Sequence, residues 1–361
     1  MNIRIKDICR FGKKSDIKAG EGNTKGKYMF FTSSIDKDKR IDKFDYDEEG
    51  IIMGTGGNAT LHYYSGKFAV STDCLVLLPN SSYKCKYLYY FFLHNMRVLE
   101  GGFRGAGLKH TSKSYIENIE LTKTHSLLEQ DKIISVLSNI DNTIVLQNKR
   151  LKLINELTRS LFIEMFGDPV ENPFMFEKQR LSKIGELERG VSKHRPRNAP
   201  ELLGGNYPLI QTGEISNSDL YINKFENTYS ELGLSQSKLW KKGTLCITIA
   251  ANIAKTGILT FDSCFPDSVV GFVPNKLTNN IFIHYWFSFF QKILEEEAPE
   301  SAQKNINLKV LSNLDVIVPP IELQNKFAAV VAQIDKSKLA VKKSLEELEI
   351  LKKSLMQKYF A

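Results

Sequence analysis

Two segments of the 361-residue chain carry apolar residues at alternating steps of three and four positions. This spacing, near 3.5 residues, is typical of a long helix with a coiled-coil seam. Neither segment contains glycine or proline between its ends, so we predict helices over residues 126–167 and 319–361. The apolar positions are Ile133, Leu137, Ile140, Ile144, Leu151, Ile154, Leu157 and Leu161 in the first, and Phe327, Val331, Ile334, Val341, Leu345, Leu348, Leu351 and Leu355 in the second.

The two segments are copies of one another at an offset of 194 residues. LLEQDKIISVLSNID, from Leu127, aligns with IELQNKFAAVVAQID, from Ile321, and the register holds to the end of the chain. Residues 128–167 contain eleven identities with their counterparts, where about two or three are expected by chance. An internal repeat constrains the architecture, and this one predicts two similar halves.

Each predicted helix is bounded by residues that break helices: Gly167-Asp168-Pro169 follows the first and Pro319-Pro320 precedes the second. At about 1.5 Å per residue, forty residues would make a rod of roughly 60 Å. An apolar stripe of that length must be buried, and the simplest partner is its own repeat. We therefore expect antiparallel pairing through the first six positions of each set given above. The alternative is two unrelated helices that pack on separate domains.

The segments that precede the helices have short apolar runs separated by Gly, Asn and Asp clusters, with one aromatic helical stretch each, at 87–96 and 281–294. These features recur in the same order in both segments. The predicted fold is α+β: two mixed α/β domains separated by two long antiparallel coiled-coil helices, with a pseudo-twofold internal repeat. The expected boundaries are 1–125 and 168–318 for the domains, and 126–167 and 319–361 for the helices.

The composition predicts a class of binding partner and a cellular compartment. The net charge of +8 and the pI near 9.0 favour a polyanion such as nucleic acid, although a lysine-rich solvated surface also explains them. The five cysteines form no CxxC pair, which favours buried, reduced thiols over a zinc site. The chain shows no apolar signal segment and no run of about 20 apolar residues, so we expect a cytoplasmic protein without a membrane partner.

The arrangement resembles the DNA-specificity subunit of type I restriction-modification systems, over essentially the whole chain. The residues that carry the resemblance are the paired helix openings quoted above, the helix end LTRSLFIEMFGDP, the strand-and-loop segment GNYPLIQTGEI (205–215) and the segment GTGGNATLHYYSGKFAVSTDCLVL (54–77). The first domain has GKYMFFTSS (26–34) where the second has GNYPLIQTGEI, so the equivalence of those loops is an open question.

The resemblance implies that each domain recognises one half of a bipartite, asymmetric site in double-stranded DNA. It implies that the helices set the spacer and dock two methyltransferase subunits, and that restriction/translocase subunits join for cleavage. It also implies that this chain does no chemistry and holds no cofactor, since S-adenosylmethionine, ATP and Mg²⁺ belong to the partner subunits.

The loops contain residue types suited to DNA, because arginine pairs with guanine, and asparagine or glutamine with adenine, while lysine binds phosphate. Glycine lets a backbone approach closely. The candidates in the first domain are Lys13, Lys14, Gly56, Gly57, Asn58, His62, Arg104, Lys109 and His110. Those in the second are Lys193, His194, Arg195, Arg197, Gln211, Thr212, Asn252, Lys255, Gln303 and Lys304.

Two other classes compete with this interpretation. A methyltransferase enzyme is disfavoured because Glu171-Asn172-Pro173-Phe174 lacks the doubled proline of the amino-methyltransferase motif, and Gly54-Thr55-Gly56-Gly57 lacks GxGxxG spacing. A coiled-coil scaffold without DNA recognition explains the helices but not the two loop-rich domains. Side positions on the helices are candidates for partner docking or for local packing: Val145, Leu146, Phe162, Met165, Ile350, Met356, Tyr359 and Phe360.

Overall fold

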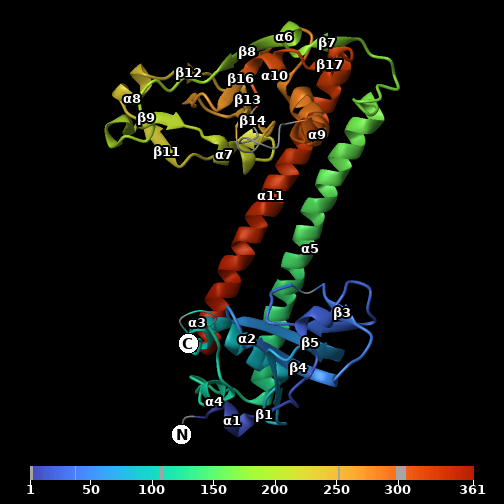
Figure 1. Cartoon of the computed structure of the whole chain (residues 1–361), viewed down its shortest axis with the longest axis vertical. Helices are drawn as coiled ribbons and strands as arrows, with labels where there is room; N and C mark the ends of the chain where they lie inside the picture. Colours follow the sequence, from blue (N-terminus) through green and yellow to red (C-terminus); the bar gives the residue numbers. More distant parts are fainter. Residues whose placement is uncertain (1–2, 37, 106, 108, 251–252, 298–305) are drawn as a thin grey trace. The chain divides into compact units, whose positions relative to one another are not determined.

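The computed structural model describes residues 3–36, 38–105, 107, 109–250, 253–297 and 306–361. The chain divides into two compact units. The first contains residues 1–148 and 343–361, and the second contains residues 149–342. The two long helices α5 (Leu127–Phe166) and α11 (Ile321–Phe360) are each unbroken (Figure 1), and each contributes residues to both units. Their bounds differ by the 194 residues of the sequence repeat.

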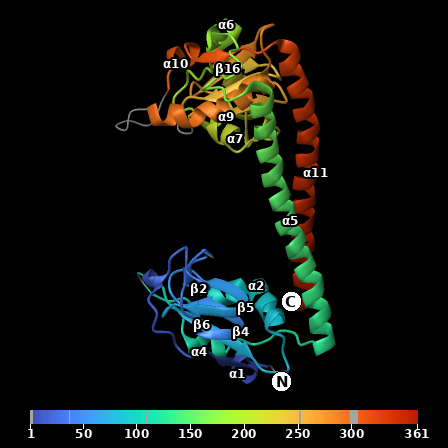
Figure 2. The same cartoon turned by 90° about the vertical axis from the view of Figure 1, so that its right-hand side faces the viewer.

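The first unit is built on a six-stranded sheet with the order β1-β6-β4-β5-β2-β3. Helix α2 packs on one face of it (Figure 2). The elements of the unit are α1 (Ile5–Ile8), β1 (Cys9–Phe11), the 3₁₀ helix η1 (Ala19–Glu21), β2 (Tyr28–Phe31), β3 (Arg40–Ile41), β4 (Tyr46–Gly54), β5 (Thr60–Val70), β6 (Cys74–Pro79), α2 (Cys85–His94), α3 (Met96–Glu100) and α4 (Lys113–Glu117).

The second unit has a five-stranded sheet, β10-β14-β13-β16-β8, a four-stranded sheet, β11-β9-β15-β12, and the pair β17-β7. Its elements are β7 (Lys178–Arg180), α6 (Leu181–Ile184), β8 (Gly185–Arg189), η2 (Pro200–Leu202), β9 (Leu203–Leu209), α7 (Thr212–Ser216), β10 (Tyr221–Ile222), β11 (Asn227–Tyr229), α8 (Glu231–Ser235), β12 (Leu239–Trp240), β13 (Leu245–Thr248), β14 (Thr256–Leu259), β15 (Ser263–Cys264), β16 (Val269–Pro274), α9 (Asn280–Glu297), α10 (Leu308–Ser312) and β17 (Asp315–Ile317).

The two units share the order and direction of their central strands. The antiparallel series β1-β6-β4-β5 in the first corresponds to β8-β16-β13-β14 in the second. Strand β2 pairs in parallel with the end of β5, and β9 pairs in parallel with β15, the strand after β14. The strands in GKYMFF and GNYPLI therefore have corresponding parallel partners, but the segments that follow them differ, because α7 follows GNYPLI whereas residues 32–36 after GKYMFF form no helix.

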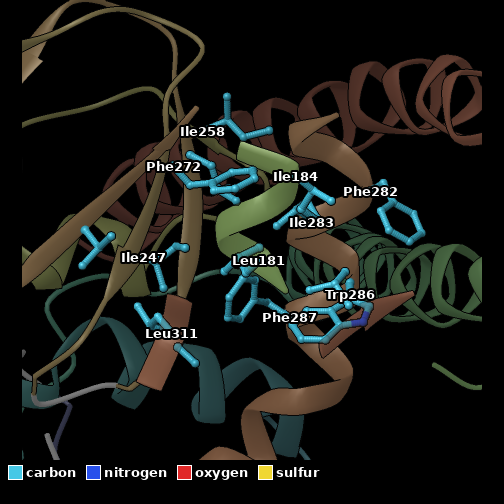
Figure 3. Close-up of a cluster of buried hydrophobic side chains, with 14 of the residues drawn as sticks. Leu181, Ile184, Ile247, Ile258, Phe272, Phe282, Ile283, Trp286, Phe287 and Leu311 are labelled. Carbon is cyan, nitrogen blue, oxygen red and sulfur yellow. The ribbon is translucent and has the colours of Figure 1, made fainter. Parts of the chain in front are cut away.

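Successive side chains of a strand lie on opposite faces of the sheet, so each central sheet contributes side chains to two cores. In β4, Ile51 and Met53 face the core that contains α2, whereas Ile52 faces the opposite core with Phe68 and Val76. The second unit repeats this pattern around α9 (Figure 3). There α9 contributes Phe282, Ile283, Trp286 and Phe287 to a core completed by Leu181, Ile184, Ile247, Ile258, Phe272 and Leu311. All five cysteines are buried.

Each unit buries the start of one long helix beside the end of the other. In the first unit, Ile133 and Leu137 of α5 share a core with Met356 and Phe360 of α11. In the second unit, the core includes Phe327 and Val331 of α11 with Phe162 and Phe166 of α5, and the rings of Phe162 and Phe327 lie 5.6 Å apart. Each of these residues corresponds to one in the other unit at the offset of 194.

Burial corrects part of the sequence interpretation. Phe162, Met356 and Phe360 are at most 6% exposed, so these candidates for partner docking are core residues. Leu157 and Leu351, which follow the apolar period, are 61% and 47% exposed and lie outside the cores. The twelve residues expected to pair the helices are all buried or half-buried.

A buried glutamine joins each long helix to its unit. Gln130 Oε1 accepts the amide of Lys84, just before α2, and its Nε2 donates to the carbonyls of Ser82 and His125. Its repeat Gln324 accepts the amide of Asn279, just before α9. Gln324 also accepts the hydroxyl of Thr278 and donates to the carbonyls of Leu277 and Pro319. Both glutamines are 0% exposed.

We expect Gln324→Leu to destabilise the second unit by about 1–3 kcal/mol, because it leaves buried polar partners unsatisfied. Both tryptophans of the chain, Trp240 and Trp286, are buried in this unit, so tryptophan fluorescence during urea unfolding reports on it. Gln130→Leu should instead shift the far-ultraviolet circular dichroism transition more than the fluorescence transition. Gln333→Leu, at an exposed position of the same helix as Gln324, is the control. An unchanged fluorescence midpoint for Gln324→Leu would contradict this role.

Candidate nucleic-acid interface

In the first unit, backbone hydrogen bonds bring six of the predicted residues together in two loops. The amide of Gly57 donates to the carbonyl of Lys109 at 2.9 Å, and Gly56 and Arg104 each form a β-bridge with His110. Gly57 has a φ of +82°, which favours glycine, and open space where a Cβ would lie. The side chains of Asn58, Arg104, Lys109 and His110 are exposed, so this cluster presents donors and positive charge to solvent.

The two predicted lysines after β1, Lys13 and Lys14, have exposed side chains, and the backbone of Lys13 is fixed by a hydrogen bond. The hydroxyl of Tyr46 donates to the carbonyl of Lys13 at 2.7 Å. Burial raises the pKa of Tyr46 to about 12, so this hydroxyl keeps its proton. The lysine pair is thus attached to the start of β4.

His62 is misplaced in the predicted set. It is 4% exposed, its Nε2 lies 3.0 Å from the carbonyl oxygen of Ser34, and its ring centroid lies 5.2 Å from that of Phe31. Because side chains alternate between the two faces of β5, His62 points into the core and is not part of the candidate interface.

In the second unit, the basic loop Lys193–Arg197 is held by the side chain of Gln236. Its Oε1 accepts the amides of Lys193, at 2.8 Å, and of His194, at 3.0 Å. The guanidinium of Arg195 also donates to the carbonyls of Ser192 and His194. The loop is therefore held both by Gln236 and by Arg195 within it, which lowers the entropy lost on binding a ligand.

Asp267 draws three arginines of this loop region together. Its carboxylate lies 3.5 Å from Arg195 and 2.5 Å from Arg197, and its carbonyl accepts two hydrogen bonds from Arg189. The contact with Arg197 is an ion pair. The side chains of Arg195 and Arg197 remain about half exposed, which leaves N–H groups to contact phosphate or a base edge.

The other candidates of the second unit are less closely grouped. Gln211 is exposed and is the N-cap residue before α7, and Thr212 is half-buried in the first turn of that helix. Lys255 is half-buried and lines a cavity together with residues of α5, α9 and α11. Asn252, Gln303 and Lys304 lie outside the described residues.

The same backbone bonds place the loops in both units. Thr111 donates to the carbonyl of Thr55, and the equivalent Ile306 donates to that of Ile249, each at 3.0 Å. Thr55 in turn donates to the carbonyl of Asp73, and Ile249 donates to the equivalent carbonyl of Ser268. The loops after β4 and β13 thus join the loops before β6 and β16 at one end of each sheet. This end is the candidate interface.

Gln236 and Asp267 hold the basic loop but are not among the residues predicted from the sequence. Asp267 is visible in the sequence as the aspartate after Phe265, but its pairing with Arg197 spans 70 positions and leaves no local pattern. Gln236 carries no sequence signal at all. Within the described ranges, no group of three or more His, Cys, Asp or Glu side chains is placed to hold a metal ion.

Comparison with known proteins identifies this arrangement. Residues 1–156 and 175–350 match the model of the type I restriction modification DNA specificity domain. The chain therefore belongs to this family and is a specificity subunit, a class that recognises DNA while catalysis lies in its partner subunits. None of the helices described here combines the length and apolar character needed to cross a bilayer.

Individual relatives agree over most of their length. The type I restriction enzyme MjaVIII specificity subunit of Methanocaldococcus jannaschii is 23% identical over 98% of this chain and 90% of its own. The EcoBI specificity subunit of Escherichia coli is 22% identical over 86% of this chain and 73% of its own. The crystal structure of the type I S subunit from M. genitalium has the same fold, with a TM-score of 0.71 at 17% identity, covering 100% of this chain and 96% of that one.

We expect Asp267→Asn to relax sequence recognition, because Arg195 and Arg197 lose the carboxylate that orients them. The methylated DNA motif of cells carrying the variant should become degenerate at one or two positions, with about tenfold loss of discrimination there, while its other positions stay fixed. Sequencing of methylated bases measures this. Asp262→Asn, which removes the carboxylate that pairs with Lys241 at 2.8 Å on an exposed turn, is the matched control. An unchanged motif in Asp267→Asn would exclude the orienting role.

Proposed function

We propose that each unit recognises one half of a bipartite, asymmetric site in double-stranded DNA, and that α5 and α11 set the spacer between the halves. The observation that carries this proposal is the equivalence of the two candidate interfaces. Equivalent backbone hydrogen bonds position the loops after β4 and β13, yet the loops differ in sequence. A common framework with different side chains suits two recognition surfaces for two DNA sequences.

The proposed domains are recognition domains at 1–125 and 168–318 and connecting helices at 126–167 and 319–361. Antiparallel pairing of the helices is supported inside each unit, where the start of one lies beside the end of the other. Ile133 and Met356 share the core of the first unit, and their repeats, Phe327 and Phe162, share the core of the second. This correspondence supports a pseudo-twofold repeat. Two moderate binding surfaces joined by stiff helices would bind a bipartite site far more tightly than either surface alone.

The proposal predicts that the two halves of the DNA site can be changed separately. Replacing residues 1–125 by the corresponding segment of another specificity subunit should change one half of the methylated motif and preserve the other half and the spacer. Methylated-base sequencing of cells with the neighbouring methyltransferase tests this, with a strain lacking only this chain as the reference. A methylome unaffected by loss of the chain would favour a scaffold without DNA recognition.

We further propose that the long helices dock two methyltransferase subunits through repeated exposed apolar residues, and that restriction/translocase subunits join this assembly. Val145 and its repeat Leu339 are 66% and 65% exposed. Leu157 and Leu351, a second repeated pair, are 61% and 47% exposed. The same apolar positions are thus left uncovered at both copies, as expected if two copies of one partner bind in the same way.

This docking model predicts a stepwise loss of stoichiometry. Native mass spectrometry should show two methyltransferase subunits on the unaltered chain, one on Val145→Asp or Leu339→Asp, and none on the double variant. A charge placed at the centre of an apolar interface weakens binding by tenfold or more. Leu232→Asp, at a 54% exposed position in the second unit, is the control. Full occupancy of the double variant would exclude this surface.

A further inference from the structure

The second unit contains a cavity of about 430 Å³ where α5, α7, α9, β14 and α11 meet. Three cationic side chains line it, from Arg159, Lys255 and Lys338, together with the carboxylate of Asp219 and the imidazole of His284. Burial lowers the pKa of His284 to about 4, so the imidazole is neutral near pH 7. The lining therefore carries an excess of positive charge.

Lys338 is the most unusual of these residues because it is only 7% exposed. Across the described part of the chain, no hydrogen bond or ion pair to its ammonium group lies within 4.0 Å. Burial lowers the pKa of Lys338, and the more distant carboxylates of Asp219 and Asp335 raise it by a smaller amount. Asp219 is already paired with Lys342 at 2.6 Å. A lysine side chain that is largely removed from water and has no ion pair gains from a nearby negative charge, and Lys338 lines a cavity that is open to a ligand.

The other two cations are held at the wall of the cavity. The guanidinium of Arg159 lies 4.4 Å above the ring of Phe289. The amide of Lys255 donates to the hydroxyl of Thr248 at 3.0 Å, and its carbonyl accepts the amide of Thr248 at 2.9 Å. The guanidinium of Arg159 and the backbone of Lys255 are thus fixed at the wall of the cavity that Lys338 also lines.

The first unit does not repeat this site. At the position equivalent to Thr158 it has Lys352, whose Nζ lies 2.6 Å from Oδ1 of Asp141. The hydroxyl of Tyr90 also donates to Asp141, at 2.8 Å. In the second unit Asp335 is the repeat of Asp141, but the lysine opposite is replaced by the shorter Thr158, which lines the cavity. The cavity is therefore a departure from the repeated framework.

We propose that this cavity binds a phosphate group, held by Lys338, Arg159 and Lys255. A phosphate would supply oxygen acceptors and negative charge to the ammonium group of Lys338 and the guanidinium of Arg159. The volume lies in the range of small-molecule sites and is sufficient for a mononucleotide. The phosphate comes either from a free ligand of that size or from the backbone of bound DNA.

The experiment uses the full-length chain and two kinds of probe. Titration calorimetry with inorganic phosphate and with AMP tests a free ligand, and fluorescence anisotropy with a 30-base-pair duplex at several salt concentrations tests DNA. The variants are Lys338→Met, which keeps the apolar stem, and Arg159→Gln, at an exposed position where folding is not at risk. Lys336→Gln, exposed on the same helix two positions from Lys338, is the control.

A free ligand is established if phosphate or AMP binds the unaltered chain and both variants weaken binding at least tenfold while the control stays within twofold. If neither small probe binds, the DNA source requires each variant to lower the slope of log affinity against log salt by about one, as loss of one phosphate contact does. The proposal is overturned if both variants behave like the control with every probe.

Discussion

The attachment of each long helix to its unit depends on one buried side chain, the glutamine in its first turn. A glutamine fully removed from water must have its amide satisfied, and the partners of Gln130 and Gln324 are backbone groups just before α2 and α9. These bonds fix where the helix enters the domain and therefore the register of every residue that follows it. Next to these bonds, Ile133 and Met356 share the core of the first unit, and the rings of Phe327 and Phe162 pack together in the second.

The long helices and their repeat could be predicted because the buried positions of a helix recur every three or four residues along the sequence. Eleven identities at a constant offset gave the two copies, and α5 and α11 follow the same offset. Gln130 and Gln324 were also visible, as identical polar residues in a repeated segment, but periodicity describes apolar faces and could not assign them to the core. Leu157 shows the opposite failure, since it fits the apolar period yet lies 61% exposed.

The candidate interface was predictable in composition and less so in geometry. Gly57 and the basic residues of both units were recognisable as loop residues with suitable chemistry. Their neighbours were not, because a contact such as Asp267 with Arg197 joins positions far apart in the chain. His62 illustrates the limit: a polar residue in a strand faces solvent or core according to alternation, and its core is built by β2, a strand supplied from another part of the sequence.

The loops of both units are fixed at their bases by bonds between main-chain atoms, as between Thr111 and Thr55 or between Ile306 and Ile249. Nearly every amino acid supplies those main-chain atoms, so these hydrogen bonds constrain the amino-acid sequence of the loops only weakly. Substitution or recombination can therefore change the side chains of the loops without altering the sheet that carries them. If the loops recognise DNA as proposed, such a protein can acquire a new target in few evolutionary steps, and one half can diverge while the other is retained.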